Sequence, residues 1–212
     1  MGDMSGDLPF TGKPSPGRLV LPSLAISSFA LEPPVILTGL LLVDIGLTFG
    51  YSVGVVGQIR TASSIVAVIF ALIMGALSVR FRHKSLLMMG LPFTSIAALG
   101  CAFALDFNMM LLFYPLSGLG AAMVRPMSTA LVGEAFPLER RSSAIGWISA
   151  SAALSHAVGA PVIGVIAGFG GWRWAFLGFV LPIPLLGLLL AAKGLPSVPH
   201  DSQPRMSKKS YM

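Results

Sequence analysis

The chain has 212 residues, of which 55% are hydrophobic and only 10% are charged, whereas soluble domains carry roughly 25% charged residues. This balance excludes most soluble folds, and the single cysteine, Cys101, excludes an internal disulfide framework. The net charge of +6 could indicate a nucleic-acid partner, so the positions of the basic residues have to be examined first.

Six apolar stretches are each long enough to cross the roughly 30 Å hydrocarbon core of a bilayer as a helix. In chain order they cover Leu19–Val43, Thr61–Val79, Ser85–Leu105, Met109–Gly133, Ser142–Phe169 and Trp174–Ala192. A segment in lipid must satisfy its backbone hydrogen bonds internally, and these stretches lack the alternating pattern of barrel strands. We therefore predict an all-α membrane protein with a bundle of six transmembrane helices over residues 19–192.

Most of the basic residues fall on one side of this predicted topology. They lie in the first tail, in alternate loops or in the last tail: Lys13, Arg18, Arg80, Arg82, Lys84, Arg140, Arg141, Lys193, Arg205, Lys208 and Lys209. The positive-inside rule places both termini in the cytoplasm, which explains the basic charge without nucleic acid. We expect a multi-pass protein of the plasma membrane, the inner membrane of a bacterium. Residues 1–18 would form a flexible cytosolic tail, and residues 193–212 a cytosolic tail or the start of a linker.

Three ionisable residues, Glu32, Arg125 and His156, lie deep in the first, fourth and fifth stretches. Such residues are costly in a membrane and are candidate functional sites. Glu32 is a candidate for proton uptake during transport, and the alternative is a static pair that orients the helices. For Arg125 the alternative is that its side chain extends to the cytoplasmic interface, and for His156 it is a hydrogen-bonded packing role. Because no residues have metal-ligand spacing, we predict neither a metal nor a cofactor.

Glycine and other small residues recur in the fourth and fifth stretches, among them Gly118, Gly120, Gly159 and Gly164. Small residues let helix backbones approach closely in a membrane. We therefore expect both helices to pack tightly in the bundle.

The turn after the second stretch and three later segments carry a family signature. The turn contains Gly75, Leu77, Ser78, Arg80, Lys84 and Leu87, and it is followed by residues 117–122, residues 136–141 and a segment with Gly159, Pro161 and Gly164. In this order the segments resemble the signature motifs of the major facilitator superfamily, with Val79 in place of the aspartate and His83 in place of an arginine of the loop motif. The resemblance covers about residues 21–192 and corresponds to the first six of the family's twelve helices.

This resemblance implies half of a secondary active transporter that moves a small solute by alternating access around a central site. It implies that helices one and four line a cavity, so that Glu32 faces Arg125 or His156, with H+ as the candidate coupling ion. Gly75, Leu77, Arg80 and Lys84 would form a gating loop between helices two and three. The helix-five segment with Gly159, Pro161 and Gly164 favours efflux, and a second six-helix half or a homodimer would complete the carrier.

Two other functions remain open at this stage. A half-carrier could be a non-transporting remnant or a membrane interaction protein. Ser117 and His156 together are superficially similar to the dyad of intramembrane serine proteases, but Pro115 stands where that motif has a glycine. We therefore predict that the chain is not an enzyme. No glycine-rich, lysine-ending nucleotide motif occurs, so a gradient rather than ATP would drive transport.

Overall fold

The computed structural model describes residues 17–78 and 80–195, and all the regular structure in these ranges is helical. The helices are α1 (Val20–Phe29), α2 (Pro33–Leu40), α3 (Leu42–Phe49), α4 (Val53–Val56), α5 (Gln58–Leu77), α6 (His83–Ala102), α7 (Phe107–Phe113), α8 (Pro115–Ala135), α9 (Leu138–Gly170), α10 (Trp172–Ala175), the π-helical turn η1 (Phe176–Val180) and α11 (Pro182–Gly194). The predicted tails lie almost wholly outside the described residues, as does Val79.

Six helical segments in the described residues are long and apolar enough to cross a membrane, which confirms the predicted all-α, six-span class. Two of the predicted boundaries are wrong, because the second segment begins at Val53 rather than Thr61 and the fifth at Leu138 rather than Ser142. Hydropathy marks only the apolar part of a span, whereas helical hydrogen bonding continues into polar flanking residues. Arg60 consequently lies within α5 and not before it.

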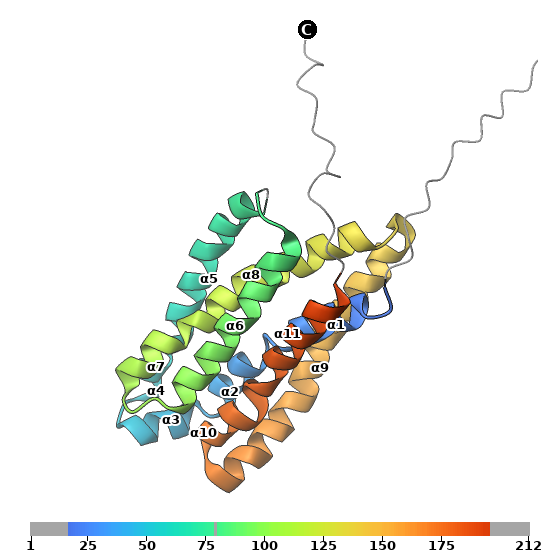
Figure 1. Ribbon diagram of the computed structural model, residues 1–212. Helices are drawn as coiled ribbons and strands as arrows, with labels where there is room; N and C mark the ends of the chain where they lie inside the picture. The colour runs from blue at the N-terminus through green and yellow to red at the C-terminus, as the bar shows by residue number, and fades with distance from the viewer. Residues whose placement is uncertain (1–16, 79, 196–212) are drawn as a thin grey trace, which may run out of the picture.

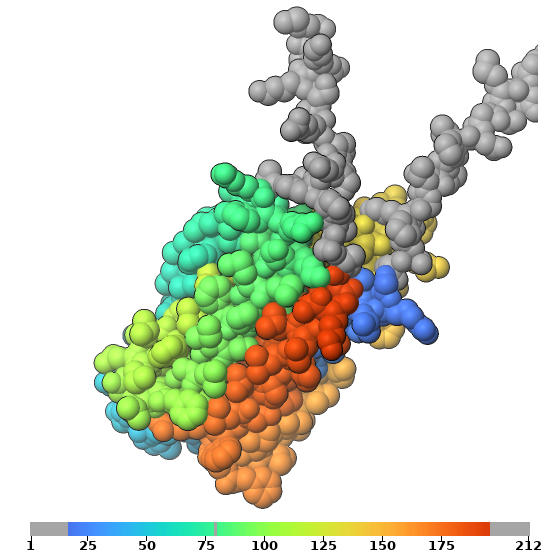
Figure 2. Space-filling model, in the orientation of Figure 1, coloured from blue at the N-terminus to red at the C-terminus, as the bar shows by residue number. Residues whose placement is uncertain are grey.

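The six spans pack as one bundle in which α6 and α8 lie side by side, while α1 packs against both α9 and α11 (Figure 1). The α5–α6 turn, the α8–α9 turn, the start of α1 and the end of α11 lie at the same end of the bundle. Both ends of the described chain therefore lie on one side, as an even number of crossings requires. Figure 2 shows the face on which α6 and α11 lie next to each other without a gap.

The apolar core has two parts, and a break in the first span lies between them. One part contains Leu24 and Leu31 of α1 and its C-terminal turn, together with residues of α6, α8 and α11. The other contains Leu37 of α2, together with residues of α6, α10 and η1. Glu32 falls between Leu31 and Leu37 in the chain, so the break brings a carboxyl group to the boundary between the two parts.

Glycines of α8 allow close approaches to the backbones of neighbouring helices. A Cβ atom at Gly118 would lie 2.2 Å from the carbonyl oxygen of Ser63 in α5, and one at Gly120 would lie 2.8 Å from the carbonyl oxygen of Gly90 in α6. Only glycine fits at such contacts. The expected tight packing of the fourth span is therefore confirmed.

The fifth span differs from this expectation, because α9 is largely exposed. Only 17% of its most apolar part is buried, against 56% for the third and fourth spans. One exposed stripe of small residues runs along the helix: Gly146, Ala150, Ala153, Ala157, Pro161, Gly164 and Gly168. We call this stripe the open face of α9. Gly159 alone among the predicted glycines of this helix packs inward, where its Cβ would lie 3.1 Å from Ile36 of α2.

Candidate functional site

A pair of prolines breaks the first span at the site. Pro33 and Pro34 lack the backbone N–H groups that a continuous helix would donate to carbonyls four residues earlier. One of these carbonyls, that of Phe29, accepts a hydrogen bond from the Ser155 hydroxyl at 3.2 Å. Ser151, one turn earlier on α9, donates to the carbonyl of Ala25 at 2.9 Å. Both serines of α9 thus bond to the backbone of the first span, and Ser155 does so at a carbonyl whose helical donor is missing.

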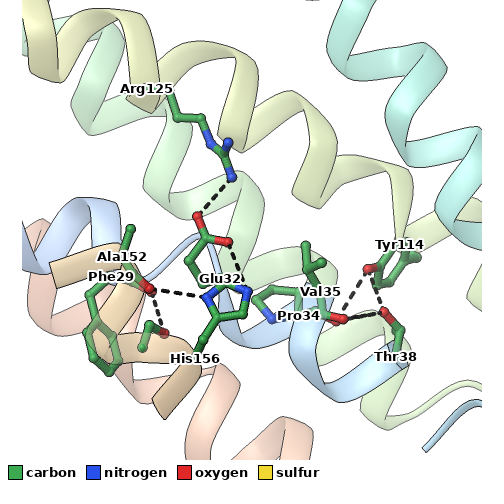
Figure 3. Close-up of polar contacts among 10 residues, drawn as sticks. Phe29, Glu32, Pro34, Val35, Thr38, Tyr114, Arg125, Ala152 and His156 are labelled. Carbon is green, nitrogen blue, oxygen red and sulfur yellow. Dashed lines mark hydrogen bonds and ion pairs between the residues drawn. The ribbon is translucent and has the colours of Figure 1, made fainter. Parts of the chain in front are cut away.

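Glu32 stands at this break and contacts two basic side chains from other spans (Figure 3). Arg125 of α8 donates from Nη2 to Oε1 of Glu32 at 2.9 Å. Nε2 of His156 in α9 lies 3.9 Å from the other carboxylate oxygen, Oε2. On its opposite side the His156 ring contacts the carbonyl of Ala152, with Nδ1 3.2 Å from the oxygen. The structure thus brings all three predicted residues together.

The three side chains differ in exposure. The Glu32 side chain is only 12% exposed, while those of Arg125 and His156 are 58% and 57% exposed. The alternative for Arg125, extension to the cytoplasmic interface, is wrong because its guanidinium points at Glu32. The His156 ring makes the hydrogen bond that its packing alternative requires, and more than half of the side chain is exposed. The Glu32 carboxylate is therefore the least accessible of the three groups, and it lies behind the Arg125 guanidinium and the His156 ring.

A second polar cluster lies on the other side of the two prolines. The hydroxyl oxygens of Thr38 and Tyr114 are 2.9 Å apart. Both hydroxyls also lie within hydrogen-bond distance of the Pro34 carbonyl, Thr38 at 2.9 Å and Tyr114 at 3.3 Å. Both side chains are buried. Sequence reasoning missed this cluster, although a tyrosine within an apolar span is a usable signal, because a buried phenol needs a hydrogen-bond partner.

A family model described as the Major Facilitator Superfamily matches residues 24–210. The chain belongs to this superfamily. Its fold resembles that of the proton:xylose symporter XylE, with a TM-score of 0.74 and 15% identity over 82% of this chain and 44% of the symporter chain. Superfamily members of this kind are transporters and not enzymes, in agreement with the prediction made above.

Two relatives in the superfamily are similar in sequence. An uncharacterised MFS-type transporter of Mycobacterium tuberculosis is 33% identical over 61% of this chain and 22% of its own length. Multidrug resistance protein 3 of Bacillus subtilis is 32% identical over 60% of this chain and 25% of its own length. The aligned part of this chain thus spans about a quarter of the length of these relatives. Six apolar helices and this membership together make the chain an integral, multi-pass membrane protein.

The family's loop motif contributes contacts between span ends. His83 Nδ1 lies 2.5 Å from Oε1 of Glu134 at the end of α8. Lys84 donates to the carbonyl of Leu195, just after α11, at 2.5 Å. Gly75 and Arg80 are exposed, and Leu77 packs against the part of the core that contains Leu24 and Leu31. Among the predicted loop residues, Lys84 therefore makes the polar contact that joins α6 to the end of α11, and its neighbour His83 joins α6 to α8.

The serine protease alternative has no geometric support. The Ser117 hydroxyl donates to the carbonyl of Tyr114 at 2.7 Å and lies 3.4 Å from the Ser63 hydroxyl. His156 instead faces Glu32. No hydrogen bond joins Ser117 to His156, both of which lie in the described part of the chain, so they form no dyad.

Proposed function

We propose that the chain is half of a secondary active transporter that moves a small solute by alternating access, with proton uptake at Glu32 coupled to solute movement. The observation that carries this proposal is the pairing of Glu32 with Arg125 at a broken helix between the two parts of the core. XylE, whose fold is similar, is a proton:xylose symporter, which adds support.

The chemistry of the coupling follows from the ion pair. While Glu32 is ionised, its charge is balanced by Arg125, and the two opposite charges attract each other at this short distance. When Glu32 takes up a proton, the carboxyl group becomes neutral and the guanidinium is released. Release of Arg125 removes the ion pair that joins α8 to the first span at the break between α1 and α2. The relative positions of these three helices can then change. Such a switch between two charge states is what coupling requires.

A second six-helix unit would cover the open face of α9. Small exposed residues along a membrane helix permit close approach of another helix, and this chain covers only 44% of the XylE chain. The unit is either the other half of a longer chain or a second copy of this one. Native mass spectrometry of the solubilised protein distinguishes a second copy from a single chain.

The turn between α5 and α6 would act as the gating element at the cytoplasmic side. His83 and Lys84 tie the start of α6 to the ends of α8 and α11, so a change in the turn is passed to two other spans. The basic residues at this end favour a cytoplasmic location for both termini of a plasma-membrane protein. The multidrug relative favours efflux as the direction of transport.

The test is uptake into vesicles that hold the full chain, alone or with its second half, across a proton gradient. A panel of labelled organic anions, lipophilic cations and sugars supplies the solute. We expect pH-dependent accumulation of at least one class, and Glu32→Gln should remove the pH dependence because the amide cannot ionise. Glu139→Gln, a change of an exposed carboxylate at the end of the bundle, is the matched control. No accumulation in any arrangement would favour a non-transporting protein.

A further inference from the structure

A solute that reaches this site meets the Arg125 guanidinium and the His156 ring before the Glu32 carboxylate. The side chains of Arg125 and His156 are more than half exposed, while Glu32 lies behind them with 12% exposure. The other acidic side chains in the described ranges, Asp44, Asp106, Glu134 and Glu139, lie near span ends. The accessible part of the site therefore offers hydrogen-bond donors that suit an anion.

Protonation of Glu32 leaves Arg125 without its charged partner, and no second carboxylate contacts Arg125 in the ranges that the structure describes. A guanidinium that loses its carboxylate partner loses a charge-assisted hydrogen bond, which is one of the stronger polar interactions in proteins. A guanidinium presents a planar fork of donors that matches a carboxylate, often through two parallel hydrogen bonds. A solute carboxylate is thus the natural replacement for Glu32.

We propose that the site takes a small organic anion whose carboxylate replaces Glu32 on Arg125 when Glu32 is protonated. This inference rests on the proposed function and assigns its substrate class. The Glu32–Arg125 pair is neutral before the exchange, and the pair of Arg125 with the solute carboxylate is neutral after it. The site therefore binds one proton with each anion, and the charge of the Arg125 pair does not change.

The groups around Glu32 support this exchange. Arg125 faces it from α8 and His156 from α9, and no further charged side chain contacts it in the part of the chain that the structure covers. The Tyr114 hydroxyl, on the far side of Pro34, bonds to Thr38 and the Pro34 carbonyl rather than to Glu32. A cationic solute, by contrast, would have to displace Arg125 and reach the Glu32 carboxylate, which is the least accessible of the three groups.

Equilibrium dialysis with the full chain in detergent tests the proposal. The probes share one ring and differ in charge: benzoate, neutral benzamide and cationic benzamidinium. We expect benzoate to bind best, with an affinity that rises by up to about tenfold for each unit of pH decrease while Glu32 takes up its proton. Glu32→Gln should bind benzoate equally well at every pH, because its side chain is permanently uncharged.

Changes of Arg125 provide the second arm. Arg125→Gln should weaken benzoate binding by at least about tenfold, and Arg125→Lys should bind weakly because an ammonium lacks the planar fork. Arg140→Gln, which removes an exposed cation at the end of the bundle, should bind normally. The exposure of Arg125 makes unfolding of these variants unexpected, and thermal unfolding curves check that they remain folded.

Three results would overturn the proposal: tighter binding of benzamidinium than of benzoate, benzoate binding that survives Arg125→Gln, or wild-type benzoate affinity that does not change with pH. A failure of the substrate class is distinguishable from a failure of the proposed function. If benzoate does not bind but uptake still depends on Glu32, the substrate class is wrong and proton coupling stands. If Glu32→Gln leaves the pH dependence of uptake intact, proton coupling at Glu32 is wrong whatever the dialysis shows.

Discussion

Two polar clusters flank the same pair of prolines, and they differ in charge and in access. Thr38 and Tyr114 form a neutral, buried cluster whose hydroxyls bond to each other and to the Pro34 carbonyl. Glu32 and its two basic partners form an ionic cluster of which two members are more than half exposed.

We expect the two clusters to have different roles, with the neutral cluster stabilising the fold and the ionic cluster taking part in transport. A neutral group that is fully bonded within one half holds the backbone together and gains nothing from a change of partner. An ionic group with accessible partners can change its charge and its partner, at a cost that a bound solute can offset. Substitutions in the two clusters should therefore affect different measurements.

The largest effect is expected for Gly118→Val, because α8 carries Arg125 of the ionic cluster and begins directly after Tyr114 of the neutral one. The new side chain would collide with the backbone of α5 at Ser63, whose carbonyl oxygen lies 2.2 Å from the Cβ position. Overpacking against backbone should cost about 3 kcal/mol or more and should abolish folded protein, measured by size-exclusion chromatography in detergent. Gly133→Ala on the same helix, where the added Cβ meets nothing within 4 Å, is the control. Normal yield of the valine variant would show that this contact is not essential.

Tyr114→Phe should affect stability without affecting coupling. It removes the hydroxyl that bonds to Thr38 and to Pro34, at a cost of about 1 kcal/mol for interhelical bonds of this kind. Thermal unfolding followed by tryptophan fluorescence measures this loss, and the pH dependence of uptake should remain as in the wild type. Arg125→Gln should show the reverse pattern. Loss of pH dependence in the phenylalanine variant would make the neutral cluster part of the transport site.

Ser155→Ala should have the smallest effect, because it removes a single hydrogen bond at the break in the first span, which lies next to both clusters. The Phe29 carbonyl would lose the hydroxyl at 3.2 Å but would keep the backbone N–H of Glu32 at 3.3 Å. We expect a loss of about 0.6 kcal/mol in the free energy of unfolding, close to the average for a hydrogen bond between membrane helices. Ser149→Ala, at an exposed position of α9, should be neutral. Equal losses in the two variants would show that the bond to Phe29 contributes nothing specific.

Much of the site could be predicted from sequence because charge in a membrane is expensive. Glu32, Arg125 and His156 stand out in apolar stretches, and the predicted depth allowed them to meet. The neutral cluster was missed because threonine and tyrosine are common in membrane helices and carry no charge to mark them. The role of Ser155 could not be predicted from the sequence either, because it depends on a carbonyl in another span whose helical donor is replaced by a proline.

Close packing was predictable only in part. Gly118 and Gly120 approach neighbouring backbones as expected, whereas a Cβ at Gly164 would meet nothing within 4 Å. A small residue permits close approach but does not name the neighbour. The arrangement of the spans decides which glycines contact another helix of the same half.

Hydropathy determined the number of spans, and the placement of the basic residues predicted that both chain ends lie on the same side. Both follow from sequence alone, because the free energy of moving a residue into lipid depends mainly on that residue's own side chain. The tertiary structure alone decided that the Glu32 carboxylate lies behind Arg125 and His156, and that one face of α9 stays open. Those features depend on the relative rotation of helices far apart in the chain, and backbone breaks and glycine contacts from several spans set that rotation together.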